Sequence, residues 1–414
     1  MNKRPASKLW MIGLLLSLAC SLVTRATPTA VPVPTQSASD RQLKVFDAVF
    51  AAVRDQYVSA DFGGVDWTGL GAQYRALVAA GQTEDEFAQT LRSLLEKLPA
   101  GAASYQTRAE RLEQETQDQA TYSGIGAFIA FRRTPSPHIV ILSTIEGAPA
   151  ARAGLLPHDS IYAINDAALT LADEATPTAR IRGEAGTAVT ITVGSPGEAP
   201  RVLALKREQI QAVDPLRGGN LSALSTAYYR LPVTAGSDLA PAIASDLDSY
   251  SQTVKLKGIV LDLRVAGSGG SWPLVEMLSL FGNGTLGEFY TRADKSPITV
   301  NGINAGGSQT LPLVLIVGAD TSGMPEVFAA ALQAAGRAVV VGQPTAGEVQ
   351  GFDTIALPDG SRLFLATSSF RTTRGLDLAR AGVKPDFPVD QDWDAYTLDK
   401  DPVLGEALSL IPQD

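Results

Sequence analysis

Residues 311–352 read LPLVLIVGADTSGMPEVFAAALQAAGRAVVVGQPTAGEVQGF, and the class of fold follows from this stretch. The apolar runs Leu313–Val317 and Ala338–Val341 predict two buried strands. Between them, small residues predict a turn over 318–323, and a helix is expected over Pro325–Ala335, because proline suits a first helical turn and glycine follows its end. A strand, a tight turn and a helix in this order place free N–H groups at the start of the helix, which is a common way to build a reaction centre.

The flanking sequence repeats this alternation of strands and helices. Lys257–Arg264 reads KGIVLDLR, an apolar strand that ends in charge, and glycines and a helix over Pro273–Phe281 are expected to follow it. Upstream we expect an edge strand at Ala227–Leu231 and a helix over Asp238–Ser251. Such an alternation predicts a mainly parallel sheet that is covered on both faces.

The composition describes a globular, acidic protein. The chain has 414 residues, too many for one ordinary core, so two or three domains are expected. Its net charge of −9, without a basic run, argues against nucleic acid as a partner. No cofactor or metal is predicted, because no cluster of histidine and cysteine occurs and the aspartates are scattered. The two histidines, His138 and His158, are better explained as ordinary surface or edge residues than as catalytic groups.

The N-terminus predicts export to the cell envelope or beyond. Residues 1–27 carry positive charge before a short apolar run, Leu9–Val23, which is typical of an export signal and too short for a comfortable membrane span. Leu16–Cys20 reads LSLAC and resembles a bacterial lipobox, so that Cys20 would become a lipidated N-terminus. Ordinary signal-peptidase cleavage is the alternative. Residues 28–40 are rich in Pro, Thr and Ser, and such a tether between membrane and domain favours the lipoprotein.

The rest of the sequence divides into four parts. Residues 41–117 have apolar positions at helical spacing and predict a helical region. Residues 118–210 form a compact unit of short strands, and residues 211–395 carry the α/β pattern described above. Residues 396–414 are expected to be a C-terminal tail.

Residues 118–210 hold a series of motifs in a defined order. The loop Gly124-Ile125-Gly126-Ala127 precedes a strand, residues 146–155 read EGAPAARAGL, and residues 161–165 read IYAIN. This series resembles a PDZ domain in its circularly permuted bacterial form. The resemblance implies that the loop offers backbone N–H groups to the terminal carboxylate of a peptide, and that the adjoining strand accepts the peptide as an added strand. A PDZ-like spacer that binds nothing is the alternative.

Markers of a second family follow along the chain: DLR before a glycine loop, the strand–turn–helix, VVGQPTAG, LPDGS and GVKPD. Together with the preceding units they resemble the S41 serine peptidases, the C-terminal (tail-specific) processing proteases, over about residues 41–390. The resemblance implies an α/β multidomain protein with an N-terminal helical segment, a PDZ-like β domain and an α/β peptidase domain of the ClpP/crotonase type. It implies peptide or protein C-terminal tails as partners and no cofactor. Gly269 and Gly270 match the family's oxyanion loop, where backbone must approach an acyl oxygen.

Both positions of the family's catalytic dyad differ in this chain. In the family a neutral lysine takes the proton of a serine, the serine attacks a peptide carbonyl, and backbone N–H groups hold the oxyanion. Aligned on Glu326, the nucleophile position falls on Gly323, with Ser322 one residue earlier, and the lysine position falls on Glu348. A carboxyl group with an ordinary pKa of about 4.3 is too weak a base at neutral pH.

Two classes of function remain open. We favour an exported pseudopeptidase that captures peptide tails through its PDZ-like unit and its cleft, because the lysine is absent. The alternative is an active serine endopeptidase that uses Ser322, with Glu348 as base in acid or with Lys255, Lys257 or Lys295 in the place of the family lysine. Lysines are missing from the whole stretch between residues 295 and 384.

Overall fold

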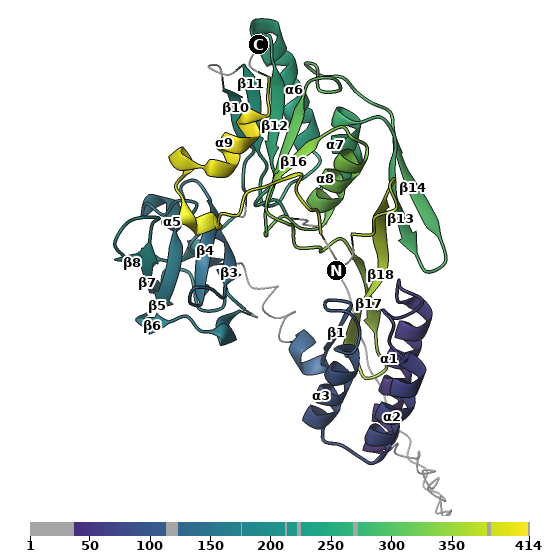
Figure 1. The fold of residues 1–414 in the computed structure, drawn as a ribbon. Coiled ribbons are helices and arrows are strands. Elements are labelled where there is room, and N and C mark those ends of the chain that lie inside the picture. The colour runs from purple at the N-terminus through teal and green to yellow at the C-terminus, as the bar shows by residue number, and fades with distance from the viewer. Residues whose placement is uncertain are drawn as a thin grey trace, which may run out of the picture.

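We describe the fold from a computed structural model of the chain. The structure describes residues 37–112, 123–174, 176–211, 213–221, 225–267, 272–378 and 382–412. Three parts meet in it: a β-domain, a central α/β domain, and a helical region that packs on a second sheet (Figure 1). This mixed α/β architecture with a helical segment at its N-terminal side is the class expected from the sequence.

The α/β domain is built on a six-stranded sheet in the order β10-β11-β12-β15-β16-β19. Every neighbouring pair is parallel except β10 and β11, as expected for strands joined by helical crossovers. The expectation that Ala227–Leu231 is an edge strand is wrong. The edge is β10, which we did not predict because its two glycines give it a low strand propensity. The strands are β10 (Arg217–Leu221), β11 (Thr226–Arg230), β12 (Gly258–Asp262), β15 (Leu313–Val317), β16 (Val339–Gly342) and β19 (Phe387–Pro388).

Helices cover both faces of this sheet, as the alternation predicted. Three of them pack on one face, where Ile259 and Leu261 of β12 contribute to the core. The last helix, α9, covers the other face together with Val260 of the same strand. Neighbouring residues of β12 belong to different cores because successive side chains of a strand point to opposite faces. The helices are α6 (Leu239–Thr253), α7 (Leu274–Phe281), α8 (Met324–Ala334) and α9 (Pro402–Ser409).

The N-terminal helices pack on a second sheet, with the order β1-β18-β13-β14. The strand β17 also pairs with β18. Leu91 and Leu94 of α3 share one core with Leu363 and Leu365 of β18. The helical region is therefore joined to the second half of the chain by strand pairing and by apolar packing. The elements are α1 (Ala38–Gln56), α2 (Trp67–Ala79), α3 (Glu84–Leu95), β1 (Ala103–Gln106), β13 (Gly284–Thr291), β14 (Lys295–Val300), β17 (Gly351–Ala356) and β18 (Arg362–Thr372).

The β-domain contains a sheet in the order β3-β4-β5-β7-β8, with β6 paired to β5, and a short β2–β9 pair. Among the strands that the structure describes, β3 pairs with β4 alone, so its other side is an open sheet edge. Its elements are β2 (Ser123–Gly124), β3 (Ala127–Arg132), β4 (His138–Thr144), α5 (Pro149–Arg152), β5 (Ser160–Ile164), β6 (Ala167–Ala168), the 3-10 turn η1 (Leu171–Asp173), β7 (Ala188–Gly194), β8 (Arg201–Lys206) and β9 (Glu208–Gln209).

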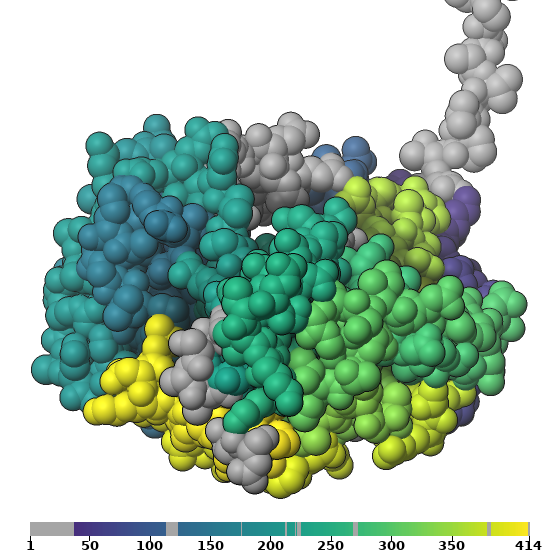
Figure 2. Space-filling model, turned by 90° about the horizontal axis from the view of Figure 1, so that it is seen from above, coloured from purple at the N-terminus to yellow at the C-terminus, as the bar shows by residue number. Residues whose placement is uncertain are grey.

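The segment that leads into α9 holds the β-domain against the α/β domain. The indole N–H of Trp393 donates to the carbonyl of Ile141 at 2.8 Å, and its ring stacks on His158 with 3.9 Å between centroids. The next residue, Asp394, is hydrogen-bonded to Nε2 of His138 at 2.9 Å. In Figure 2 this C-terminal segment, in yellow, lies along both the blue and teal β-domain and the green α/β domain.

Both histidines are buried at this contact, each only 1% exposed, so the expectation of surface or edge positions is wrong. The physical reason is that residues 393 and 394 return over the β-domain from the far end of the chain. No local pattern around either histidine announces such a partner.

Among the described helices, none is both long and apolar enough to cross a membrane. The expected leader, including the lipidation residue Cys20, lies outside the described residues. Lipidation therefore stays a prediction.

Candidate active site

The central stretch forms a strand, a tight turn and a helix, as predicted. The turn between β15 and α8 is held by Thr321, which is fully buried. Its hydroxyl accepts from the N–H of Gly318 at 3.0 Å and donates to the carbonyl of Leu263 at 2.9 Å. The turn is thus fastened to the residue that follows β12, at the carboxyl ends of two neighbouring parallel strands.

Gly323 is the residue at the predicted nucleophile position, and its backbone is unusual. It precedes α8 with φ 65° and ψ −126°, a conformation that residues with a side chain rarely adopt. A strained residue between a strand and a helix is how a nucleophile elbow presents its reacting hydroxyl. Here the strained position carries a glycine, which has no hydroxyl to present.

Ser322 lies beside this position and is half-buried. Its N–H donates to the carbonyl of Ala266 at 3.1 Å, and its Oγ lies against Gly267, where an added β-carbon would be 3.4 Å from it. Within the described ranges, no side chain is hydrogen-bonded to Ser322 Oγ. The predicted oxyanion residues Gly269 and Gly270 lie outside the described residues.

Glu326 connects the two predicted dyad positions. Its side chain is fully buried and accepts four hydrogen bonds: from the N–H groups of Gly323 at 3.1 Å, Gly347 at 2.7 Å and Glu348 at 2.8 Å, and from the hydroxyl of Thr345. One oxygen, Oε2, accepts from both Gly323 and Glu348. The structure therefore brings the backbones of these two positions to the same carboxylate.

Burial raises the pKa of Glu326, while its four hydrogen bonds favour the ionised form. These donors belong to the turn and to the segment after β16. The carboxylate of Glu326 therefore joins the turn to that segment. In the sequence, Glu326 served only to align the predicted dyad positions. One signal in the sequence could have indicated that Glu326 binds the turn. It lies three residues after Gly323, the residue that caps α8, and a carboxylate at that position can reach back to the N–H of the capping residue.

The remaining candidates for a proton acceptor are spread over the molecule. Glu348 is exposed and takes part in the contact with Glu326 through its backbone N–H. Lys255 and Lys257 precede the amino end of β12, whereas the turn follows the carboxyl end of β15, its parallel neighbour. The length of the five-residue strand, about 16 Å, therefore separates these lysines from the turn. Lys295 is on β14 of the second sheet, 64% exposed, with Nζ 3.6 Å from Glu288. None of the three lysines lies beside the turn.

The predicted peptide-binding loop has free backbone donors. Gly126 has φ 75°, and a β-carbon there would lie 2.3 Å from that of Ala148. The carbonyls of Ile125 and Gly126 accept from Ala150 at 2.8 Å and Ile145 at 3.0 Å, but neither residue's N–H donates a backbone hydrogen bond to any described residue. Two successive free N–H groups at such a turn form a small anion-binding concavity.

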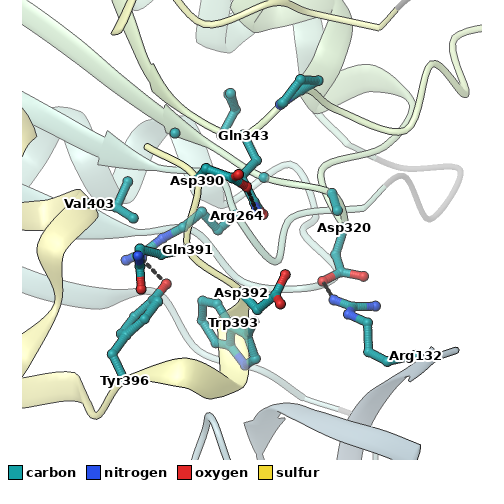
Figure 3. Close-up of a pocket in the computed structure, with 15 residues that line it drawn as sticks. Arg132, Arg264, Asp320, Gln343, Asp390, Gln391, Asp392, Trp393, Tyr396 and Val403 are labelled. Atoms are coloured by element: carbon teal, nitrogen blue, oxygen red, sulfur yellow. Dashed lines mark hydrogen bonds and ion pairs between the residues drawn. The ribbon is translucent and has the colours of Figure 1, made fainter. Parts of the chain in front are cut away.

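The strand after this loop, β3, leads from the loop to the nucleophile turn. Gly124 ends β2, and Ala127 begins β3. Phe128 of β3 packs against an apolar cluster that includes Val265. Val265 directly precedes Ala266 and Gly267, the two residues beside Ser322. At the end of β3, Arg132 forms an ion pair with Asp320 of the turn (Figure 3). The loop and the turn are therefore joined by one strand.

A cavity of about 300 Å³ lies next to this ion pair and is lined by polar residues such as Gln343 and Asp392. Arg264 also lines it, but its guanidinium is already bound by Asp262 and Asp401, each at 2.6 Å. It also donates to the hydroxyl of Tyr396 (Figure 3). These contacts give Arg264 a structural role that holds the α9 segment to the end of β12. Across the described part of the chain, no group of three or more His, Cys, Asp or Glu side chains is arranged to hold a metal.

Comparisons with known proteins agree with this fold. The model of peptidase family S41 matches residues 225–389, and the model of the tricorn protease C1 domain matches residues 42–96. The chloroplastic carboxyl-terminal-processing peptidase 2 of Arabidopsis thaliana is 25% identical over 402 residues, which cover 92% of this chain and 74% of that protein. The carboxyl-terminal-processing protease of Synechocystis sp. is 27% identical over 412 residues, with coverages of 94% and 89%.

Among solved structures, the photosystem II D1 C-terminal processing protease superposes with a TM-score of 0.63. It is 24% identical and covers 92% of this chain and 98% of its own, which shows a shared fold. The fold is thus that of the C-terminal processing proteases. The chain is similar to peptidase family S41 over residues 225–389 and to carboxyl-terminal-processing proteases over most of its length.

Proposed function

We propose that this protein is an exported pseudopeptidase of the S41 family that binds peptide or protein C-terminal tails. The observation that carries the proposal is the chemistry at the two dyad positions. Gly323 holds the strained backbone of a nucleophile elbow without a hydroxyl, and Glu348 stands where the family has an amine. An acyl-enzyme needs a side-chain nucleophile and a proton acceptor at these places.

Ser322 is a poor replacement for the missing nucleophile. Its hydroxyl lies against the backbone of Gly267, and within the described chain it has no partner to take its proton. The exposed side chain of Glu348 is a carboxylate, and a solvated carboxylate is a weak general base at neutral pH.

We infer that residues 118–210 act as a PDZ-type module for tail binding. The free N–H groups of Ile125 and Gly126 would hold a terminal carboxylate, in the manner of backbone nests. The open edge of β3 would accept the residues before it as an added strand. These features support capture of a tail independently of any peptide cleavage.

The decisive experiment compares wild type, Ser322→Ala and the double variant Gly323→Ser with Glu348→Lys on peptides with apolar free tails. We expect no turnover by wild type or Ser322→Ala, and cleavage or labelling by a serine-directed probe only where both dyad groups are supplied. Circular dichroism and melting temperature would confirm that all three are folded. Turnover by wild type that Ser322→Ala loses would establish the alternative, an active serine endopeptidase.

Tail binding has its own test. Calorimetry with peptides that end in a free apolar carboxylate should show affinity, and the same peptides with an amidated end should lose it. Equal affinity for both forms would refute the role given to the Ile125–Gly126 N–H groups.

The proposed membrane attachment concerns Cys20 and is tested in cells. Processing that is sensitive to globomycin in the natural sequence and absent in Cys20→Ser would support a lipoprotein. Insensitive processing would support an ordinary exported form.

A further inference from the structure

We propose that β3 sets the length of tail that this protein recognises: about six extended residues are needed for a bound peptide to reach the nucleophile turn. The inference rests on the proposed tail binding and adds which residue of the bound tail lies beside each end of β3. It follows from where β3 begins, where it ends, and what covers its two faces.

The direction of the bound peptide follows from the position of the loop. The free N–H groups of Ile125 and Gly126 stand immediately before β3, so a terminal carboxylate held there lies at the amino end of the strand. The peptide must then extend toward the carboxyl end of β3. Its own chain direction is therefore antiparallel to β3, which is the pairing that β3 already makes with β4 on its other side.

The length of β3 gives the number of residues. The strand Ala127–Arg132 has six residues, and an antiparallel strand rises about 3.4 Å per residue, which gives about 20 Å in total. Because antiparallel partners pair one to one, about six residues of the peptide are needed to cover this distance. All six residues of β3 are only half-buried, as expected of a strand that can accept a partner.

The two faces of β3 define the surroundings of an added strand. Ile129 and Phe131 face the core of the β-domain, whereas Phe128 and Ala130 pack toward the α/β domain near Val265. An added strand would present its side chains alternately in the same two directions. Alternate residues of the tail would thus face the core of the β-domain and the apolar cluster that includes Val265.

The end of β3 lies at the turn itself. Arg132, the last residue of β3, pairs with Asp320, which is two residues before Ser322 in the same turn (Figure 3). A residue about six positions from the carboxylate would therefore arrive at the turn. The class of ligand that fits is an unstructured tail of at least this length, because an added strand must be extended along the whole of β3.

The test uses the full chain and a series of three- to ten-residue peptides that share one apolar C-terminal sequence with a free carboxylate. Calorimetry should show affinity that rises with each added residue up to about six and then stays level. An affinity that is complete at three residues, or that still rises at ten, would overturn the inference. Failure of every peptide to bind would overturn both the inference and the proposed tail binding.

A second measurement locates the peptide. In ten-residue peptides, a photoreactive benzoylphenylalanine is placed in turn at each position counted from the tail. We expect labelling of residues 318–323 from positions near six and labelling of the β-domain from positions two and three. If binding is strong but the turn is labelled from position two, or from no position, the proposed register is wrong while tail binding stands. Amidated peptides serve as the control for labelling without loop capture.

Discussion

The carboxylate of Glu326, in the first turn of α8, accepts a hydrogen bond from the hydroxyl of Thr345, which follows β16. The same carboxylate holds the N–H groups of Gly323 and Glu348. One buried acid thus joins the turn at the predicted nucleophile position to the segment at the predicted base position. Any loss of its donors would leave a buried carboxylate without partners, which is costly.

Glu326→Gln should destabilise the protein although the side chains have nearly the same size. One carboxylate oxygen becomes an NH₂ group that faces backbone N–H donors, so at least one buried donor is left unsatisfied. We expect a loss of about 2 kcal/mol in the free energy of unfolding, measured by urea denaturation.

The matched control is Glu276→Gln, which changes an exposed acid in the first turn of α7. It should change the free energy of unfolding by less than about 0.5 kcal/mol. Equal effects of the two substitutions would contradict the role given to Glu326.

Gly323→Ala should be destabilising because it places a β-carbon on a backbone with φ 65° and ψ −126°. We expect a cost of about 1–3 kcal/mol from backbone strain. Gly405→Ala is the control: Gly405 lies within α9, with open space where its β-carbon would be, and alanine should stabilise a helix interior by about 0.5–1 kcal/mol. Denaturation midpoints that move in the same direction for both variants would argue against strain at Gly323.

The stability of the contact between the β-domain and the C-terminal segment should depend on pH through both histidines. Burial opposes the charge of His138, but its bonds to Asp394 and to the carbonyl of Ser136 outweigh this and raise its pKa above 6.5. Its contribution is complete below pH 6.5 and is lost as pH rises through the raised pKa. The approach of Arg132 is a smaller, opposing influence.

Burial lowers the pKa of His158 below 6.5, with the charge of Arg264 acting in the same direction and Asp262 and Asp401 against it. Its Nδ1 is hydrogen-bonded to the carbonyl of Trp393, while Nε2 has no partner in the described structure. The contribution of neutral His158 is therefore complete above pH 6.5 and is lost as pH falls through the lowered pKa.

Melting temperatures between pH 5.5 and 8 test these opposite signs. His158→Asn should flatten the acid side of the profile, because it removes the titrating imidazole. Asparagine is chosen because it tolerates the left-handed backbone at this position, where φ is 77°. His138→Gln should flatten the alkaline side. Profiles that keep the wild-type shape in both variants would show that other groups control the pH dependence.

Trp393→Ala should loosen the β-domain, because it removes a buried ring that stacks on His158 and donates to Ile141. Truncation of a buried tryptophan costs about 3–5 kcal/mol, and hydrogen exchange of β4 should become faster. Trp67→Ala is the control: Trp67 is also buried but lies in the helical region. It should lower stability without selective exchange in β4, and selective exchange there would contradict the assignment.

Local elements of the α/β domain were predictable because their signals lie in neighbouring residues. The strand β15 spans the predicted residues, and α8 begins and ends one residue before the predicted bounds. The helix α7 likewise differs from its prediction by one residue. The strand β10 was not predicted, because the reason for its glycines is a contact with another strand. The backbone of β11 approaches so closely that a β-carbon at Gly218 would lie 2.2 Å from the carbonyl oxygen of Tyr228.

What the sequence by itself determined is the order of the strands and helices in the α/β domain, because it follows from patterns along the chain. The sequence also predicts Gly323 and Glu348 at the dyad positions, from their spacing to Glu326. Only the tertiary structure decided that Glu326 holds these positions together and that the end of β3 meets the turn at Asp320. Such contacts join segments far apart in the chain. Their geometry depends on how whole elements pack, which no local run of residues encodes.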